Sequence, residues 1–251
     1  MEVSVNLKNP SQFFAAAGLT VLLDTSSRFE VPQYEGQPRF RASLVLPNFD
    51  MGTLLRTLKS ATYTEVSEAG GAKYSAKKES KVDNLPVRMQ VGEQKFELDW
   101  WLNEFWSGKS GLKLWAGTTV PISLLRRLTK LLPTTSEDIL NEGVEASTTN
   151  RPSWGFRPAR QTGVAANLDK ATIYPIAELL CAVGLQYFRP VMNSDGITFC
   201  VWRDELPWEA AMASSELEGV RTYRLTARRE KCGKGKFNFS AAEFVTGAMA
   251  H

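Results

Sequence analysis

The amino-acid sequence predicts an α+β fold built mainly from antiparallel strands, with hairpins and a few helices. Three observations favour this fold. Apolar residues alternate with others over residues 39–46, as in a strand with one exposed face. Turn-forming residues at 193–196 and glycines at 233 and 235 each separate two strand-like segments, as in hairpins. Short segments with helix-start signals stand between the strand-like ones.

The first half is expected to contain two short helices near its start. Asn9 is the predicted cap of the first helix, Pro10 occupies its first turn and Gly18 ends it. Asp50 is the predicted cap of the second helix, which runs to Lys59.

The stretch 62–84 is rich in Ser, Lys, Glu and Gly and predicts a long hairpin tip or mobile loop. Strand-like sequence resumes over residues 87–101, and a helix is expected from Pro121 to Leu132. The lysines of the loop are candidate phosphate contacts: Lys77, Lys78 and Lys81.

A polar stretch rich in Ser and Thr, residues 133–152, is the best candidate for a boundary. It divides the chain into an N-terminal α+β region, 1–132, and a C-terminal α+β region, 153–251. The second region is expected to contain a helix over 175–183, a hairpin over 185–201, a short acidic helical segment within 204–218 and a basic hairpin over 221–239.

The helix at the start of each region carries a similar sequence, QFFAAAGL over residues 12–19 and ELLCAVGL over residues 178–185. Each is followed by strand-like sequence, so two similar helix-plus-hairpin halves are a hypothesis. The alternative is that any buried helix that starts at a proline and stops at a glycine has this appearance.

Composition bounds the class of protein. The chain has 251 residues, 43% of them hydrophobic, which is enough to bury a substantial core. Its three cysteines match neither a zinc site nor a disulfide framework, which favours a reducing cytoplasm. A signal-peptide-like start and an apolar run of membrane-spanning length are both absent from the sequence, so we expect a soluble, cytoplasmic protein with no membrane partner.

The residues that most enzymes need are scarce. The only histidine is His251, the last residue of the sequence, where fixed geometry is rare. Without an internal histidine, the usual base for a serine or cysteine nucleophile is absent, although lysine-based variants stay open. The aspartates are scattered and do not suggest a metal site. We therefore expect no enzymatic activity, no metal and no cofactor.

Basic residues are concentrated near the C-terminal hairpin. Residues 221–236 contain seven basic side chains against one acidic side chain, whereas the whole chain has a net charge of only +3. Along a strand, alternate residues face the same way, so this ribbon can hold several cations along one phosphate track. The alternative is a solvated strand pair whose charges block aggregation. The candidate residues are Arg221, Arg224, Arg228, Arg229, Lys231, Lys234 and Lys236.

Two further basic groups are candidates for nucleic-acid contact. The helix expected over 121–132 carries Arg126, Arg127 and Lys130 opposite an apolar face, which suits either a sugar-phosphate backbone or water. The third group interleaves arginines with aromatic residues, as single-strand or RNA binding requires. It consists of Arg151, Arg157 and Arg160 with Trp154 and Phe156, although the two aromatic residues can equally belong to the core.

Three segments resemble a known family. They are VNLKNPSQFFAAAGL over residues 5–19, KLWAG over residues 113–117 and YPIAELLCAVGLQYFRP over residues 174–190. They are similar to the small type I-U, or I-G, CRISPR-associated proteins, which count as divergent large-subunit components of the Cascade effector. The segments are spread along the chain in the order expected for that family.

The resemblance implies a non-catalytic subunit of a guide-RNA-loaded complex that binds double-stranded target DNA. The partners it implies are guide RNA, target DNA, other Cascade subunits and the helicase-nuclease recruited after target binding. Sequence recognition is then left to base pairing, and the protein holds backbones and shape. A structural scaffold that contacts only protein partners and a guide-processing nuclease are the alternatives. The candidate site residues rest on charge clustering alone.

Overall fold

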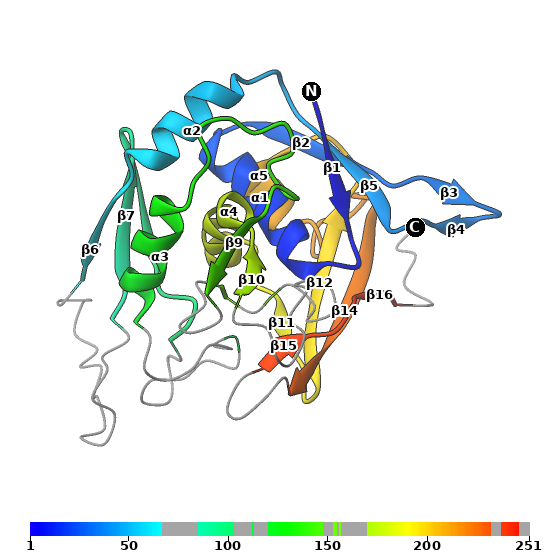
Figure 1. Cartoon of the computed structure of the whole chain (residues 1–251). Coiled ribbons are helices and arrows are strands. Elements are labelled where there is room, and N and C mark those ends of the chain that lie inside the picture. The colour runs from blue at the N-terminus through cyan, green and yellow to red at the C-terminus, as the bar shows by residue number, and fades with distance from the viewer. Residues whose placement is uncertain are drawn as a thin grey trace.

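The computed structural model describes residues 1–66, 85–102, 112, 120–147, 153–154, 156, 170–231 and 237–245. Within these residues the α+β prediction is confirmed: helices alternate with strands that form several small sheets (Figure 1). Every strand pair in the described part of the chain is antiparallel.

The described helices and strands have the following bounds. The helices are α1 (Pro10–Leu22), α2 (Met51–Lys59), α3 (Pro121–Lys130), α4 (Pro175–Tyr187) and α5 (Trp208–Met212). The strands of the first half are β1 (Glu2–Asn6), β2 (Ser26–Glu30), β3 (Gln33–Tyr34), β4 (Gln37–Pro38), β5 (Arg41–Val45), β6 (Thr62–Glu65), β7 (Val87–Val91) and β8 (Gln94–Leu98). The later strands are β9 (Val144–Ser147), β10 (Lys170–Ile173), β11 (Val191–Met192), β12 (Gly196–Trp202), β13 (Leu206–Pro207), β14 (Thr222–Lys231), β15 (Phe237–Phe239) and β16 (Glu243–Phe244).

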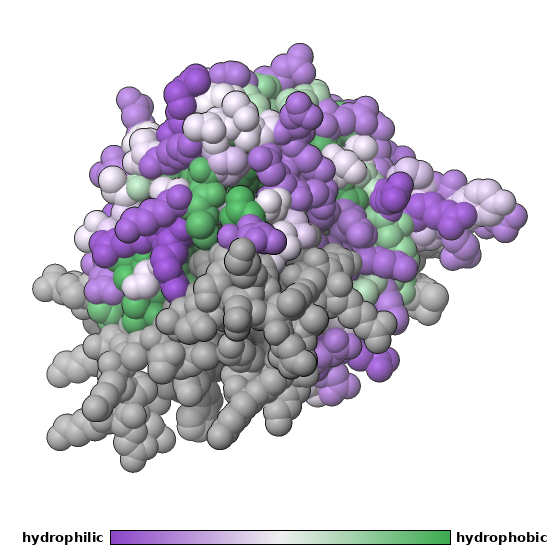
Figure 2. Space-filling model, viewed as in Figure 1, coloured by the Kyte–Doolittle hydropathy of each residue, from purple (hydrophilic) through white to green (hydrophobic). Residues whose placement is uncertain are grey.

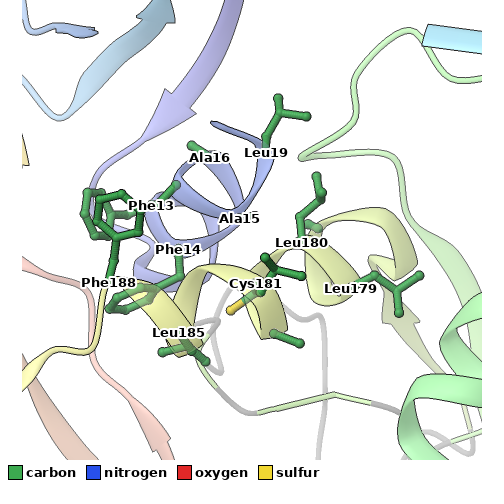
Figure 3. Close-up of a cluster of buried hydrophobic side chains, with 14 of the residues drawn as sticks. Phe13, Phe14, Ala15, Ala16, Leu19, Leu179, Leu180, Cys181, Leu185 and Phe188 are labelled. Carbon is green, nitrogen blue, oxygen red and sulfur yellow. The ribbon is translucent and has the colours of Figure 1, made fainter. Parts of the chain in front are cut away.

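Two helices from opposite ends of the sequence form the centre of the molecule. All thirteen residues of α1 are buried, which explains why its sequence is apolar almost all round rather than on one face. α1 lies directly against α4, and Phe14, Leu180 and Leu185 belong to the buried cluster around these helices (Figure 3). The predicted N-cap is confirmed, because the Asn9 side chain accepts a hydrogen bond from the backbone N–H of Ser11 at 3.1 Å.

The predicted ends of both central helices are wrong. Gly18 and Gly184 do not stop α1 and α4 but lie inside them, where the two helices cross. A Cβ atom added to Gly18 would lie 1.9 Å from the carbonyl oxygen of Leu180, and one added to Gly184 would lie 1.8 Å from that of Phe14. Glycine is therefore required by the close approach of two backbones and not by a left-handed helix end.

The crossing is reciprocal. In each helix the glycine follows the residue that supplies the facing carbonyl by four positions, Phe14 before Gly18 and Leu180 before Gly184. Aligning residues 12–19 with 178–185 makes Phe14 equivalent to Leu180 and Gly18 equivalent to Gly184. The duplication of a helix-plus-hairpin unit stays a prediction.

Sheets surround the helix pair. Strands β1, β5, β2 and β13 form one sheet in that order, and β11, β12, β14 and β15 form another, in which β16 also pairs with β14. In Figure 1, α1 and α4 lie between the β6–β7 hairpin with α3 on the left and the long strands β12 and β14 on the right. Phe13 of α1 stacks on Phe199 of β12, and β12 pairs with the basic strand β14, so the core links α1 to β14.

Several local predictions are refined. Asp50 caps α2, which ends at Lys59 as expected. The stretch 87–101 is a hairpin and not one strand, because Gly92 adopts a positive φ of 59° that allows a tight turn between β7 and β8. Thr62–Glu65 is a strand rather than loop, whereas 67–84 lies outside the described residues.

The second half also differs in detail. The acidic helical segment is the single short helix α5, and the boundary stretch 133–152 contains β9, which pairs with β10. Ile139 and Leu140 in the same stretch are buried. The domain limits themselves stay a prediction.

Candidate nucleic-acid interface

The basic hairpin predicted over 221–239 exists, and its first strand has two distinct faces. In β14, Tyr223, Leu225 and Ala227 are buried, whereas Arg224 and Arg228 are exposed. This alternation follows from the two-residue period of a strand. β14 pairs with β12 and also with β15 and β16, so the two arginines stand on a strand held on both sides.

Arg224 and Arg228 are the basic side chains best placed to meet an anion. Being four residues apart on one face, they are separated by roughly 13 Å along the strand. Within the described part of the chain, neither forms an ion pair with a carboxylate. Gly196 lies opposite Arg228 in the strand pair, and a Cβ there would meet the carbonyl oxygen of Ala227 at 2.0 Å, so a glycine is needed for β12 to approach β14.

The other candidates on the ribbon are arranged differently. Arg221 donates from its guanidinium to the carboxylate of Asp204, with Nε–Oδ1 and Nη2–Oδ1 distances of 2.8 and 2.6 Å, so its charge is already compensated. These hydrogen bonds hold the pKa of Asp204 below its ordinary value. Arg229 is exposed at the opposite face from Arg228, and its backbone N–H donates to the carbonyl oxygen of Asp195. Lys231 ends β14, but its side chain lies outside the described residues, as do Lys234 and Lys236.

The predicted basic face of α3 is present. Ile122, Leu125 and Leu128 are buried, and Arg126 and Lys130 are exposed on the other side. Arg126 donates to the carbonyl oxygen of Tyr63 at 3.3 Å, and the half-buried Arg127 donates to that of Ser123. In Figure 1, α3 lies on the opposite side of the molecule from β14, so the basic residues of the two elements belong to separate parts of the surface.

The floor beneath the α3 face is a buried tyrosine. The hydroxyl groups of Tyr63 and Thr129 lie 2.6 Å apart. Burial raises the pKa of Tyr63 to about 12, so this hydroxyl stays neutral at physiological pH. Its contact with Thr129 holds β6 against α3.

The aromatic residues of the third basic group are core residues. Trp154 and Phe156 are fully buried, and Trp154 lies against Trp100 with ring centroids 5.3 Å apart. Neither ring can stack on a nucleic-acid base, so the prediction that these two residues bind a single strand is wrong. Both are buried because packing against other aromatic rings in the core is more favourable than exposure to water. The arginines of this group, Arg151, Arg157 and Arg160, lie outside the described residues, as do Lys77, Lys78 and Lys81.

A buried carboxylate fixes the segment around Trp154. Glu178 lies in the first turn of α4 and is 2% exposed. Its carboxylate accepts hydrogen bonds from Ser153 Oγ at 2.8 Å and from the backbone N–H of Trp154 at 2.9 Å, and its backbone carbonyl accepts one from the Trp154 indole. A buried charge is tolerated only with such partners, so the carboxylate is a structural clamp.

Sequence reasoning missed a pocket beside Arg224. Its volume is about 440 Å³, and its lining comes from α1, α5, β11, β12, β14 and the residues next to them. Residues so far apart in the sequence give no local pattern, which is why the pocket could not be found in advance. Its sides include the exposed apolar residues Val191, Met212 and Val245.

In the described ranges, no group of three or more His, Cys, Asp or Glu side chains could hold a metal ion. Cys181 is buried and Cys200 is half-buried. Among the coloured residues in Figure 2, hydrophilic ones predominate, with smaller apolar areas between them.

A search for membrane-spanning helices and comparisons with known proteins add no assignment of function. None of the helices in the described part of the chain combines the length and the apolar character that crossing a membrane requires. Comparisons with protein-family models, with curated proteins and with solved structures find no match to this chain.

Proposed function

We propose that this chain is a non-catalytic subunit of a type I CRISPR Cascade effector, and that it contacts target DNA, guide RNA or both through the outer face of β14. In this role it would help recognise the flanking motif and recruit the helicase-nuclease. The resemblance over residues 5–19, 113–117 and 174–190 supports the assignment to Cascade.

One observation carries the nucleic-acid contact. Arg224 and Arg228 are exposed on the same face of β14, and in the described structure no carboxylate neutralises either of them. Phosphate attraction needs accessible cations whose charge is not already compensated, which distinguishes this pair from Arg221. A strand embedded in a sheet also keeps the two charges at a fixed spacing, so binding costs little ordering of the protein.

The double variant Arg224→Ala/Arg228→Ala tests the proposal. Binding of the purified chain to single-stranded and double-stranded oligonucleotides is measured by fluorescence anisotropy between about 50 and 200 mM salt. Loss of two phosphate contacts should weaken binding to both and reduce the slope of log K against log salt by about 1.5.

The control is Arg41→Ala/Lys59→Ala, which removes the same charge from exposed positions on β5 and α2. It should leave the salt slope unchanged. Equal slopes for the two double variants would remove β14 from the binding surface. If the β14 variant instead binds oligonucleotides normally but no longer co-elutes with partner subunits in gel filtration, the chain is a scaffold. Cleavage of precursor RNA by the purified chain would show a nuclease.

A further inference from the structure

The pocket beside Arg224 has the features of a ligand site. Its volume of about 440 Å³ lies within the range of roughly 300–1,000 Å³ that is usual for small-ligand sites. The lining combines three phenylalanines, Phe13, Phe188 and Phe199, with a few hydroxyl and amide groups. Such a site holds an apolar or aromatic body and orients it through a small number of hydrogen bonds.

The apolar part of the pocket has a buried floor of aromatic side chains and a rim of exposed apolar side chains. Phe13 stacks on Phe199 with ring centroids 4.6 Å apart, and Phe188 stacks on Trp202 at 5.0 Å, so the floor is fixed by the core. Seven large hydrophobic side chains are exposed in the described part of the chain, and three of these, Val191, Met212 and Val245, line this pocket. Clustering of exposed apolar side chains around a hollow marks a binding surface.

The charge of the pocket selects an anionic ligand. The described lining residues include Arg189 and Arg224 and no Asp or Glu. Arg189 is already paired with Asp99, which leaves Arg224 as the lining cation whose charge is available. Arg224 also belongs to the exposed pair on β14, so the pocket opens beside the surface proposed to follow a phosphate backbone.

Hydrogen-bonding groups in the pocket suit the edge of a base. Thr198 and Asn193 lie at the β11–β12 hairpin, where the Asn193 amide donates to the Thr198 hydroxyl at 2.8 Å. That bond leaves the amide oxygen of Asn193 and a proton of the Thr198 hydroxyl for a ligand. Bases that are unstacked from a single strand are held in this way, between apolar side chains and a few polar groups.

We propose that this pocket receives one unpaired base of a single strand, DNA or RNA, while Arg224 contacts the adjacent phosphate. The inference rests on the proposed nucleic-acid contact and adds to it that the ligand is a single strand with a base turned into the protein. The same phosphate-bearing strand can come from displaced target DNA or from guide RNA, and separate DNA and RNA probes distinguish these sources.

The test compares two probes of equal length and charge, a base-bearing single strand and an abasic strand. A base held in the pocket should make the wild-type chain bind the base-bearing strand about tenfold more tightly. Met212→Glu places a carboxylate at the pocket and should reduce this preference to about twofold or less; because the added charge weakens binding of both probes, the ratio between them is the readout.

Leu217→Glu is the matched control. Leu217 has nearly the same exposure as Met212, 42% against 46%, and does not line the pocket. This variant should keep the tenfold preference. A second measurement needs no pocket substitution: in a Cys232→Ser background, the base-bearing strand should protect the pocket residue Cys200 from a maleimide, and the abasic strand should not.

The outcomes separate the two proposals. If strands bind with salt dependence but the wild type does not distinguish base-bearing from abasic probes, or Met212→Glu behaves as Leu217→Glu does, the pocket inference is wrong and the phosphate surface stands. If neither probe binds, the proposed function fails and the pocket inference fails with it. If Met212→Glu loses a co-purifying protein while the base preference remains, the pocket binds protein and not a base.

Discussion

The crossing of α1 and α4 predicts that a glycine-to-alanine substitution inside either helix lowers the free energy of unfolding instead of raising it. In most helix interiors this change stabilises a protein by up to about 1 kcal/mol, because alanine has the higher helix propensity. At Gly18 the new Cβ would lie 1.9 Å from the Leu180 carbonyl oxygen, whereas ordinary contact begins at 3.4 Å. The two backbones would have to separate by roughly 1.5 Å.

That separation sets the magnitude. Overpacking costs about 1–3 kcal/mol and sometimes more. A gap of 0.5–1 Å also forfeits roughly a quarter to a half of each dispersion contact, and every residue of α1 is buried. After subtracting the propensity gain, we expect Gly18→Ala to lower the free energy of unfolding by about 2–4 kcal/mol. The melting temperature should fall by roughly 5–15 °C.

Urea denaturation followed by tryptophan fluorescence measures this effect. Gly184→Ala should act like Gly18→Ala, and the double variant should cost less than the sum, because either substitution alone forces the same separation. Gly52→Ala in α2 is the control, since its Cβ meets the flexible end of Arg56 at 3.2 Å and the Asp50 carboxylate at an ordinary contact distance of 3.6 Å. If Gly18→Ala and Gly52→Ala were equally stable, the close crossing would be refuted.

Three further predictions concern single side chains. Folding raises the pKa of Tyr63 from 10 to about 12, so its contribution to the free energy of unfolding is complete below pH 10 and is lost as pH rises from there towards 12, by up to about 3 kcal/mol. Tyr63→Phe should therefore flatten the alkaline loss of stability measured by urea denaturation. Parallel pH curves for the wild type and the variant would contradict this. Glu178→Ala should cost about 2–5 kcal/mol, since it strips the Trp154 N–H of its acceptor in a buried site; a measured loss below about 0.5 kcal/mol would exclude the clamp. Asp204→Asn should make the stability of the protein less sensitive to acid. Hydrogen bonds from Arg221 lower the pKa of Asp204 from 3.8, so the stabilisation by this pair is present above pH 3.8 and is lost as pH falls through the lowered pKa. If the melting temperatures of wild type and variant depend on pH in the same way between about pH 2 and 5, the pair contributes nothing.

Local signals in the sequence were enough to predict where helices begin and how strands alternate. Asn9 and Asp50 are caps that act on neighbouring N–H groups, so no knowledge of the fold is needed to recognise them. The two faces of β14 also follow from alternation, and Arg224 and Arg228 were predicted from charge.

Features that depend on distant partners were not predictable in this way. Gly18 looks like a helix stop because the carbonyl of Leu180, which demands a glycine, is far away in the sequence. Trp154 looks like a stacking residue beside arginines until the aromatic side chains that cover it are known. Charge counts also could not separate Arg221, whose charge Asp204 compensates, from the exposed arginines.

The position of α1 has a consequence for how the protein is made. A ribosome synthesises α1 well before its neighbour α4, which ends at Tyr187, so the side of α1 that packs against α4 stays uncovered in the nascent chain until then. Contacts between segments so far apart in the sequence form slowly, and the exposed apolar surface promotes aggregation until they form. We therefore expect the nascent chain to bind chaperones until its second half has been synthesised.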